Sequence, residues 1–214
     1  MEGIETRRSI RAFKSTAIPK EIIERILQAA SKSPSYTNTQ PWEVAVVSGE
    51  KKDDLSKFLL KIVELDTTPN PDLPQPKVWP SELERRAKEH GAKRFRALGI
   101  ERENQQQRKE LRLRNFRFYG APSVLFLFMD SSLTSWSIFD MGLFTQNLIL
   151  VAHSFGLGSC LQASIANYPD AIREFLGIPK TKLLILGISI GYPDLEAAIN
   201  TYQSSRMNLN DFVY

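Results

Sequence analysis

Hydrophobic and polar positions recur with helical spacing in the first third of the chain. Residues 19–33 (PKEIIERILQAASKS) carry five apolar residues on one face and predict a helix with a single buried side: Ile22, Ile23, Ile26, Leu27 and Ala30. The Ser33-Pro34 step disfavours helical backbone, so we expect a loop over 33–42, SPSYTNTQPW. The β-branched run 42–48 then predicts a strand closed by Gly49, and 51–64 returns to helical spacing.

The middle of the chain is poor in apolar residues. Residues 66–80 contain five prolines and predict an extended surface segment, and 81–118 is compatible with helix, with breaks expected at Gly91 and Gly99. Because its apolar residues are too sparse for a core of their own, we interpret 66–118 as a lid-like helical insertion in a single domain, 1–214. A solvated helical excursion with no role in chemistry stays the alternative.

The last third is strongly apolar. PSVLFLFM (122–129) predicts a buried strand, 135–158 a long helix ended by Gly156, 169–179 a short helix and 182–193 a second central strand. The long helix is apolar nearly all round, which is typical of large cores or subunit interfaces, and we favour an interface. The tail 204–214 is expected to be extended. The predicted class is α+β, with helices on both sides of the strands.

The charge of the protein is localised. The chain has 214 residues, 42% apolar, and a formal net charge of +4. Residues 82–118 contain twelve Lys/Arg against six Glu, a net of +6, which leaves −2 for the remainder. Glu residues interrupt this run throughout, as on a solvated helix face, so we expect no nucleic-acid partner. A basic polyanion-binding module stays the alternative from another class.

Few residues suit metal or disulfide chemistry. Cys160 is the single cysteine, and His90 and His153 have no ligands at metal spacing, so we expect no metal. The first residues lack an apolar signal core and no segment has the ~18 apolar residues of a membrane span, so we expect a cytoplasmic protein without membrane association.

Two polar segments are candidate binding elements. RRSIR (7–11) offers bidentate donors suited to a phosphate. Asn38 and Gln40 in the 33–42 loop could read the edge of a heterocycle, although a loop that caps its own backbone is the simpler interpretation. GLGSCLQAS (156–164) lacks phosphate-loop spacing, and Cys160 lies in an apolar context.

Taken in order, several segments resemble the FMN-dependent nitroreductase family: RRSIRAF at 7–13, SPSYTNTQPW at 33–42, QNLILVAHSFGLGSC at 146–160, GISIGYPD at 187–194, and Arg206. The resemblance runs along almost the whole chain apart from the insertion. It implies a nitroreductase-like fold, in which helices flank a central, mostly antiparallel sheet. It also implies an intertwined homodimer with exchange of the C-terminal tails and two FMN sites at the interface.

The resemblance also implies roles for particular residues. Arg7, Arg8 and Ser9 would hold the FMN phosphate and ribityl chain, with Arg206 closing over the phosphate and Arg11 near the pyrimidine edge. The partner subunit would contribute its 33–42 loop, with Pro34, Ser35, Tyr36, Asn38 and Gln40. One ring face would be covered by Leu161, Gln162, Ala163 and Ser164. The flavin carries the chemistry, so no catalytic side chain is implied beyond electrostatic support from Arg11.

The implied reaction is electron transfer from NADH or NADPH to a small planar aromatic acceptor, a nitroaromatic or quinone, by a ping-pong mechanism. Other reactions of the family are alternatives: reductive dehalogenation, and enone or flavin reduction. A flavin-holding protein without turnover is a further one. The segment 79–102 resembles the insertion of members acting on nitroaromatics, and its neighbourhood offers aromatic faces for stacking: Trp79, Phe95, Phe116 and Tyr119. The sequence leaves open the physiological acceptor, the preferred nicotinamide, and one- or two-electron chemistry.

Overall fold

A four-stranded antiparallel sheet organises the protein. The computed structural model describes residues 1–213. The strand order is β1-β2-β4-β3, with β1 Glu43–Ser48, β2 Ser123–Asp130, β3 Gly158–Gln162 and β4 Lys182–Gly191. The helices in the described residues are α1 Glu2–Thr6, α2 Lys20–Ala30, α3 Gly49–Glu64, α4 Ser81–Ala97, α5 Gln105–Leu113, α6 Ser135–Ser154 and α7 Pro169–Leu176. This arrangement confirms the predicted α+β class.

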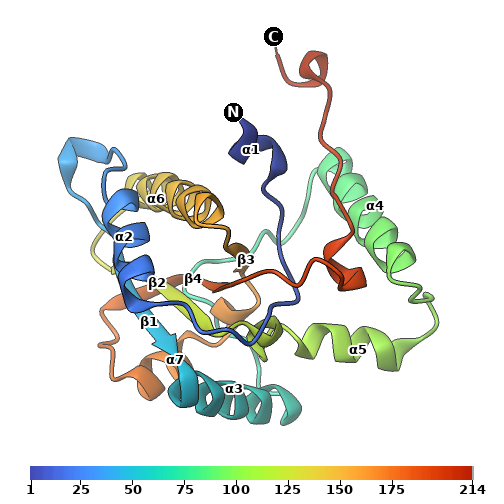
Figure 1. The fold of residues 1–214 in the computed structure, drawn as a ribbon, viewed down its shortest axis with the longest axis horizontal. Coiled ribbons are helices and arrows are strands. Elements are labelled where there is room, and N and C mark those ends of the chain that lie inside the picture. Colours follow the sequence, from blue (N-terminus) through green and yellow to red (C-terminus); the bar gives the residue numbers. More distant parts are fainter. Residues whose placement is uncertain (214) are drawn as a thin grey trace.

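Helices cover both faces of the sheet (Figure 1). Side chains alternate across the central strand β2, so that Leu125, Leu127 and Met129 pack with α2 and α6. Phe126 and Phe128 point to the opposite face and pack in the layer that contains α3 and α7. All but the last residue of β2 are buried, which confirms the predicted buried strand and explains its continuous apolar run.

Most predicted elements are present, and two predictions were wrong. Gly156 at φ 73° follows α6 in left-handed geometry, as expected, and Gly177 at φ 70° does the same after α7. The break predicted at Gly91 is absent, because α4 continues through it, whereas Gly99 at φ 64° does end that region. The long helix predicted over 135–158 ends at Ser154, and residues 158–162, for which no strand was predicted, form β3.

The insertion is anchored at both of its ends. Within 66–80, the Asp72 carboxylate accepts from Arg173 on α7 at 2.5 and 3.2 Å and from the Leu184 N–H at 2.7 Å. At the other end, Phe116 and Phe118 are buried in the core. Between them α4 and α5 lie to one side of the sheet (Figure 1) and contribute few buried side chains. Whether 66–118 acts as a lid stays a prediction.

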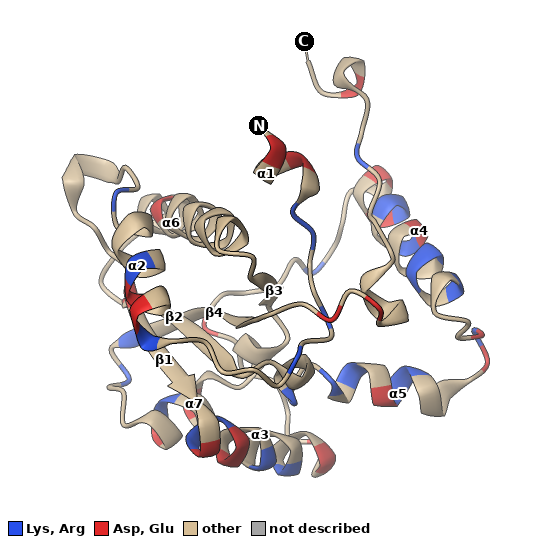
Figure 2. Cartoon of the chain, in the orientation of Figure 1, with Lys and Arg blue, Asp and Glu red and all other residues tan. Residues whose placement is uncertain are grey.

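The basic character of the insertion is partly neutralised within it. On α4, Arg85 bridges Glu82 and Glu89, each at 2.7 Å, and Lys88 pairs with Glu84 at 2.6 Å. Acidic positions therefore lie among the basic ones along α4 and α5 (Figure 2). This is the pattern of a solvated helix face.

The two termini meet at the β3 side of the sheet. Ser9 forms a parallel bridge with Ser159, and Phe13 an antiparallel bridge with Pro193. The C-terminal tail then runs away from the body (Figure 1), as the predicted extended segment requires. Tyr214, the last residue of the predicted domain and tail, lies outside the described residues. No helix among residues 1–213 is long and apolar enough to cross a membrane.

Candidate functional site

The N-terminal arginine segment is added to the free edge of β3. The Ile10 N–H donates to the Ser159 carbonyl at 2.9 Å. Gly158 permits this approach, because a Cβ at that position would lie 2.5 Å from Ile10 Cγ1. The geometry therefore places Arg7, Arg8 and Arg11 at the rim of the sheet.

Asn200 fixes the backbone of this segment from the C-terminal side. Its Oδ1 accepts from the Arg11 N–H at 2.7 Å, and its Nδ2 donates to the carbonyls of Ala12 at 2.8 Å and Asp194 at 2.7 Å. Its side chain is 1% exposed. The sequence analysis did not identify Asn200, since nothing in its local sequence reveals contacts almost 190 residues away.

A cavity of about 400 Å³ joins the predicted phosphate-binding residues. Arg7, Arg8, Ser9, Arg11 and Arg206 all line it. Among residues 1–213, no carboxylate lies within 4 Å of these four guanidinium groups. Burial and then the charge of Arg206 lower the pKa of Arg7. Glu5 also lines the cavity but forms no ion pair with these arginines. Four cations against one carboxylate suit an anionic ligand.

Helix α4 adds further basic groups to this region. His90 Nδ1 lies 3.1 Å from the Tyr202 hydroxyl, and burial, followed by Arg94, Arg11 and Arg206, lowers the pKa of His90. Burial and then Arg11 lower the pKa of Arg94, whose Nε is buried without a hydrogen-bond partner among the described residues. Figure 2 shows Lys and Arg on α4, on the segment after α1 and on the C-terminal tail. Arg94 was not predicted as a site residue.

The β3 edge beyond Ser159 presents backbone groups to the same side. The Ser159 carbonyl points away from β4, toward Ile10. Alternate residues of a strand direct their backbone groups to the same side, so the Leu161 N–H also points away from β4. The Leu161 side chain is 44% exposed. Ala163 is exposed and Ser164 half-buried just after the strand.

Gln162 has a role within the fold. Its side chain is buried, accepts from the Ser189 hydroxyl and donates to the Asn115 carbonyl at 2.8 Å. Its position in β3 turns its backbone toward Gly187 of β4. This arrangement does not support direct ligand binding by Gln162.

The loop 33–42 lies against the start of α6. The Tyr36 N–H donates to the buried Asp140 carboxylate at 3.1 and 3.2 Å, and its ring stacks on Trp136 with centroids 5.8 Å apart. Ser35 Oγ accepts from the Gln40 N–H at 3.0 Å, while the side chains of Pro34, Asn38 and Gln40 are exposed.

Three residues of this loop have left-handed backbone without being glycine: Thr37 at φ 48°, Asn38 at φ 59° and Gln40 at φ 48°. For Thr37 and Gln40 such a conformation costs about 1–3 kcal/mol and is typical of functional loops held by their surroundings, whereas asparagine adopts it more readily. The loop does cap part of its own backbone, because the Gln40 N–H donates to Ser35 Oγ and the Asn38 N–H donates to the Ser35 carbonyl. A plain connection does not need three left-handed residues, so we keep the loop as a candidate binding element.

A single chain does not bring the loop and the arginines together. The loop contacts Asp140, near the start of α6. Thr6, just before the arginines, contacts the other end of the same helix, where its Oγ1 lies 2.9 Å from His153 Nε2. At 1.5 Å per residue these two contacts are about 20 Å apart along the helix.

The aromatic residues expected to stack on a substrate have different environments. Phe116 is buried in the core and is not available. Phe95 lies under the Arg108 guanidinium, 4.4 Å from the ring centroid. Trp79 is about half exposed. Among the described residues, no group of three or more His, Cys, Asp or Glu could hold a metal ion.

The family is established by comparison with known proteins. A sequence model of the nitroreductase family matches residues 4–192. The chain belongs to the nitroreductase family. The segments that suggested this resemblance thus gave a correct prediction, and the arginine cavity lies within the matched region except for its C-terminal residues, 202–206.

Two relatives are similar along nearly the whole chain. Nitroreductase NfnB of Mycolicibacterium smegmatis is 35% identical over 97% of this chain and 88% of that protein. The 4-nitrobenzoate reductase of Pseudomonas putida is 34% identical over 99% of this chain and 92% of that protein.

Solved structures confirm the nitroreductase fold. The FMN-dependent nitroreductase NfnB from Mycobacterium smegmatis, crystallised in complex with NADPH, superposes with a TM-score of 0.95 at 33% identity, covering 100% of this chain and 96% of that one. The FMN and NADPH-dependent NfnB from sphigopyxis sp. strain HMH gives 0.96 at 29% identity, with the same coverage.

Proposed function

We propose that this protein is an FMN-dependent oxidoreductase that transfers electrons from NAD(P)H to a nitroaromatic or quinone-like acceptor by a ping-pong mechanism. The observation that carries the proposal is the cavity in which four arginines lack any carboxylate within 4 Å among residues 1–213. The relatives support it, since they include an FMN-dependent nitroreductase bound to NADPH and a 4-nitrobenzoate reductase.

The residues present fit FMN. Arg7, Arg8 and Arg206, with the Ser9 hydroxyl, would hold the phosphate and ribityl chain, since guanidinium groups bind phosphate through paired donors. The Arg11 cation would stabilise negative charge on the reduced ring, and the Leu161 N–H offers a backbone donor. When bound, FMN would supply the redox chemistry, so these residues need only bind, orient and stabilise charge.

We further propose that the protein works as a homodimer through α6. Apolar side chains form an exposed or half-exposed stripe along this helix at i, i+3, i+7 and i+14: Trp136, Phe139, Leu143 and Leu150. Trp136 and Phe139 are 62% and 61% exposed in the single chain. Figure 2 shows that α6 carries almost no charge, so nothing but a partner would keep this face from water.

Antiparallel packing of two α6 helices would complete the site. It would bring the 33–42 loop of one subunit, at the start of its α6, to the end of the other α6, where the arginines lie. Pro34, Ser35, Tyr36, Asn38 and Gln40 would then reach the cofactor of the partner. The tail would wrap the partner with its exposed apolar residues: Met207, Leu209, Phe212 and Val213.

In this proposal residues 1–214 form one FMN-binding domain in which the insertion 66–118 borders the substrate side. His90 and Arg94 of α4 support this position, because their pKa values respond to Arg11. The reducing cytoplasm suits the buried free thiol of Cys160.

The visible absorption spectrum of the purified protein tests the function. We expect flavin absorption after addition of FMN, and anaerobic bleaching by NADPH or NADH that a nitroaromatic reverses. Arg11→Ala should slow flavin reduction more than it lowers FMN occupancy, with Lys14→Ala on the same segment as the control. A protein that takes up no FMN would overturn the proposal. A loaded protein that no nicotinamide bleaches would favour a flavin holder instead.

The dimer has its own test. The double substitution Trp136→Glu, Phe139→Glu should convert the dimer into monomer in light scattering and abolish FMN binding. Leu65→Glu introduces the same charge at a 70% exposed apolar site beyond α3, on the opposite face of the sheet, and should leave the dimer intact. A wild-type protein that is monomeric and still binds FMN would contradict the shared site.

A further inference from the structure

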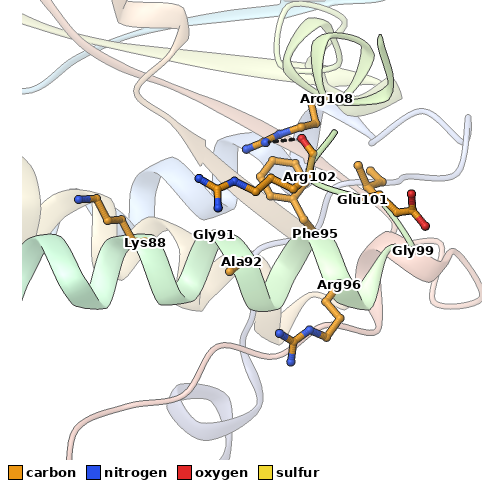
Figure 3. Close-up of a pocket in the computed structure, with 10 residues that line it drawn as sticks. Lys88, Gly91, Ala92, Phe95, Arg96, Gly99, Glu101, Arg102 and Arg108 are labelled. Atoms are coloured by element: carbon orange, nitrogen blue, oxygen red, sulfur yellow. Dashed lines mark hydrogen bonds between the residues drawn. The ribbon is translucent and has the colours of Figure 1, made fainter. Parts of the chain in front are cut away.

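A further cavity lies outside the arginine site just described. It measures about 880 Å³ and is lined by α4 and by the turn between α4 and α5. That volume lies in the range of roughly 300–1,000 Å³ typical of cofactor and ligand pockets. Figure 3 shows its lining residues, which come from two turns of α4, the turn, and the start of α5.

Two arginines converge over one side of α4. Arg108 donates to the Arg102 carbonyl at 3.0 Å, and its guanidinium lies over the Phe95 ring. Figure 3 shows both side chains extending in the direction of Lys88, above Gly91 and Ala92. The Glu101 carboxylate points the other way, and Arg96 projects from the opposite side of the helix.

The charges of these two arginines are not compensated. Among residues 1–213, neither Arg102 nor Arg108 has a carboxylate within 4 Å. Lys88 is different, because Glu84 already holds it at 2.6 Å. The cavity therefore offers two guanidinium groups without a carboxylate partner among the described residues, and guanidinium is the group best suited to phosphate.

The shape of the cavity admits a flat group beside this charge. A Cβ at Gly91 would meet nothing within 4 Å, so the floor at this point is open. Arg108, stacked on Phe95, presents its outer face to the cavity, and guanidinium planes stack on aromatic rings. A purine attached to a phosphate would match both features.

One helix separates this cavity from the proposed cofactor site. His90 and Arg94 lie on the side of α4 next to Arg11, whereas Lys88 and Phe95 line the cavity. Lys88 and Arg94 are about 9 Å apart along the helix axis. NADPH bound with its adenine end in this cavity would cross α4 to bring its nicotinamide to the cofactor site.

We propose that this cavity binds the 2′-phosphate and adenine of NADPH, so that the protein selects NADPH over NADH. The inference rests on the proposed function. It concerns the 2′-phosphate, which NADPH carries and NADH lacks. Two guanidinium groups without carboxylate partners match a doubly charged phosphate better than they match the single carboxylate of a small aromatic acceptor. Such an acceptor would also leave most of the cavity of about 880 Å³ empty.

Calorimetry on the purified protein tests the site apart from catalysis. Adenosine 2′,5′-bisphosphate should bind at least about tenfold more tightly than AMP, which lacks the 2′-phosphate, because charged hydrogen bonds to phosphate are lost with it. Arg102→Ala should abolish this preference. Lys93→Ala removes the same charge from α4 at a position that lines none of the cavities described, and should preserve it. Equal affinity of the wild type for both nucleotides would overturn the inference.

Anaerobic stopped-flow reduction of the FMN-loaded protein gives the second readout. Arg102→Ala should lower the second-order rate constant of flavin reduction by NADPH about tenfold. The corresponding rate constant with NADH should stay within about twofold of the wild-type value. Equal losses for both nicotinamides would refute the inference while leaving the proposed function intact. A protein that binds no FMN would sink the function, and the bisphosphate measurement would still decide whether the cavity holds a 2′-phosphate.

Discussion

The buried ion pair between Asp72 and Arg173 gives a quantitative prediction about how the insertion is attached. Arg173 is 6% exposed and Asp72 12% exposed. Burial alone would lower the pKa of Arg173, but its hydrogen bonds with Asp72 and Asp170 outweigh burial and raise it. The charge of Arg173 therefore depends on these partners, and Asp72 is the one that is also buried.

Asp72→Ala removes three charge-assisted hydrogen bonds, two from Arg173 and one from the Leu184 N–H. Removing one partner of a buried pair costs about 3–5 kcal/mol. Asp170 and the Lys182 carbonyl still hold Arg173 at 2.9 Å each, so we expect the lower end, about 3 kcal/mol. For a chain of this size that corresponds to a drop in Tm of roughly 6–12 °C.

Urea and thermal unfolding at one fixed protein concentration measure this effect. Asp53→Ala is the matched control, because its carboxylate is 59% exposed in an ion pair with Lys52 and should contribute less than about 1 kcal/mol. Asp72→Asn keeps an oxygen that can accept from the Leu184 N–H. Its loss of stability should therefore lie between those of Asp72→Ala and Asp53→Ala. A loss for Asp72→Ala no larger than that of the control would refute the reasoning.

Three further predictions concern the β3 side and the sheet end. Gly158→Ala should weaken FMN binding more than it destabilises the fold, because the new Cβ would displace Ile10 and the adjoining arginines; equilibrium FMN titration beside unfolding checks this, and unchanged affinity would contradict it. Burial raises the pKa of the Cys160 thiol, so thiol reagents should label it only after denaturation; rapid native labelling would count against this. Hydrogen bonds, first from Ser132 and then from Lys182, lower the pKa of Asp130 from 3.8 to about 2, so its stabilising contribution is present above pH 4 and is lost as pH falls toward 2. Carboxyl NMR titration measures it, and an ordinary value would disprove it.

Elements with strong local patterns were predictable from the sequence. The continuous apolar run of β2 and the left-handed glycines after α6 and α7 need only neighbouring residues to be recognised. At Gly91 the good helix formers on both sides outweigh a cost of about 1 kcal/mol, so the predicted break does not occur. The five residues of β3, GSCLQ, have little strand preference, and their pairing with β4 decides their structure.

The candidate site was predictable only in part. The resemblance selected Arg7, Arg8, Arg11 and Arg206, which the fold gathers at one cavity. It could not identify the contacts that position them, because Asn200 and Asp140 act on segments more than 100 residues away. Gln162 was included because it lies in the segment 161–164, which the resemblance places over one face of the flavin, yet its side-chain contacts lie within the core. These features belong to the tertiary structure, which no local pattern encodes.

The grip of Asn200 on Arg11, Ala12 and Asp194 has a consequence for biosynthesis. Translation proceeds from the N-terminus, so the ribosome makes the arginine segment almost 190 residues before Asn200. The segment therefore lacks this anchor until Asn200 has itself been made and has folded against it.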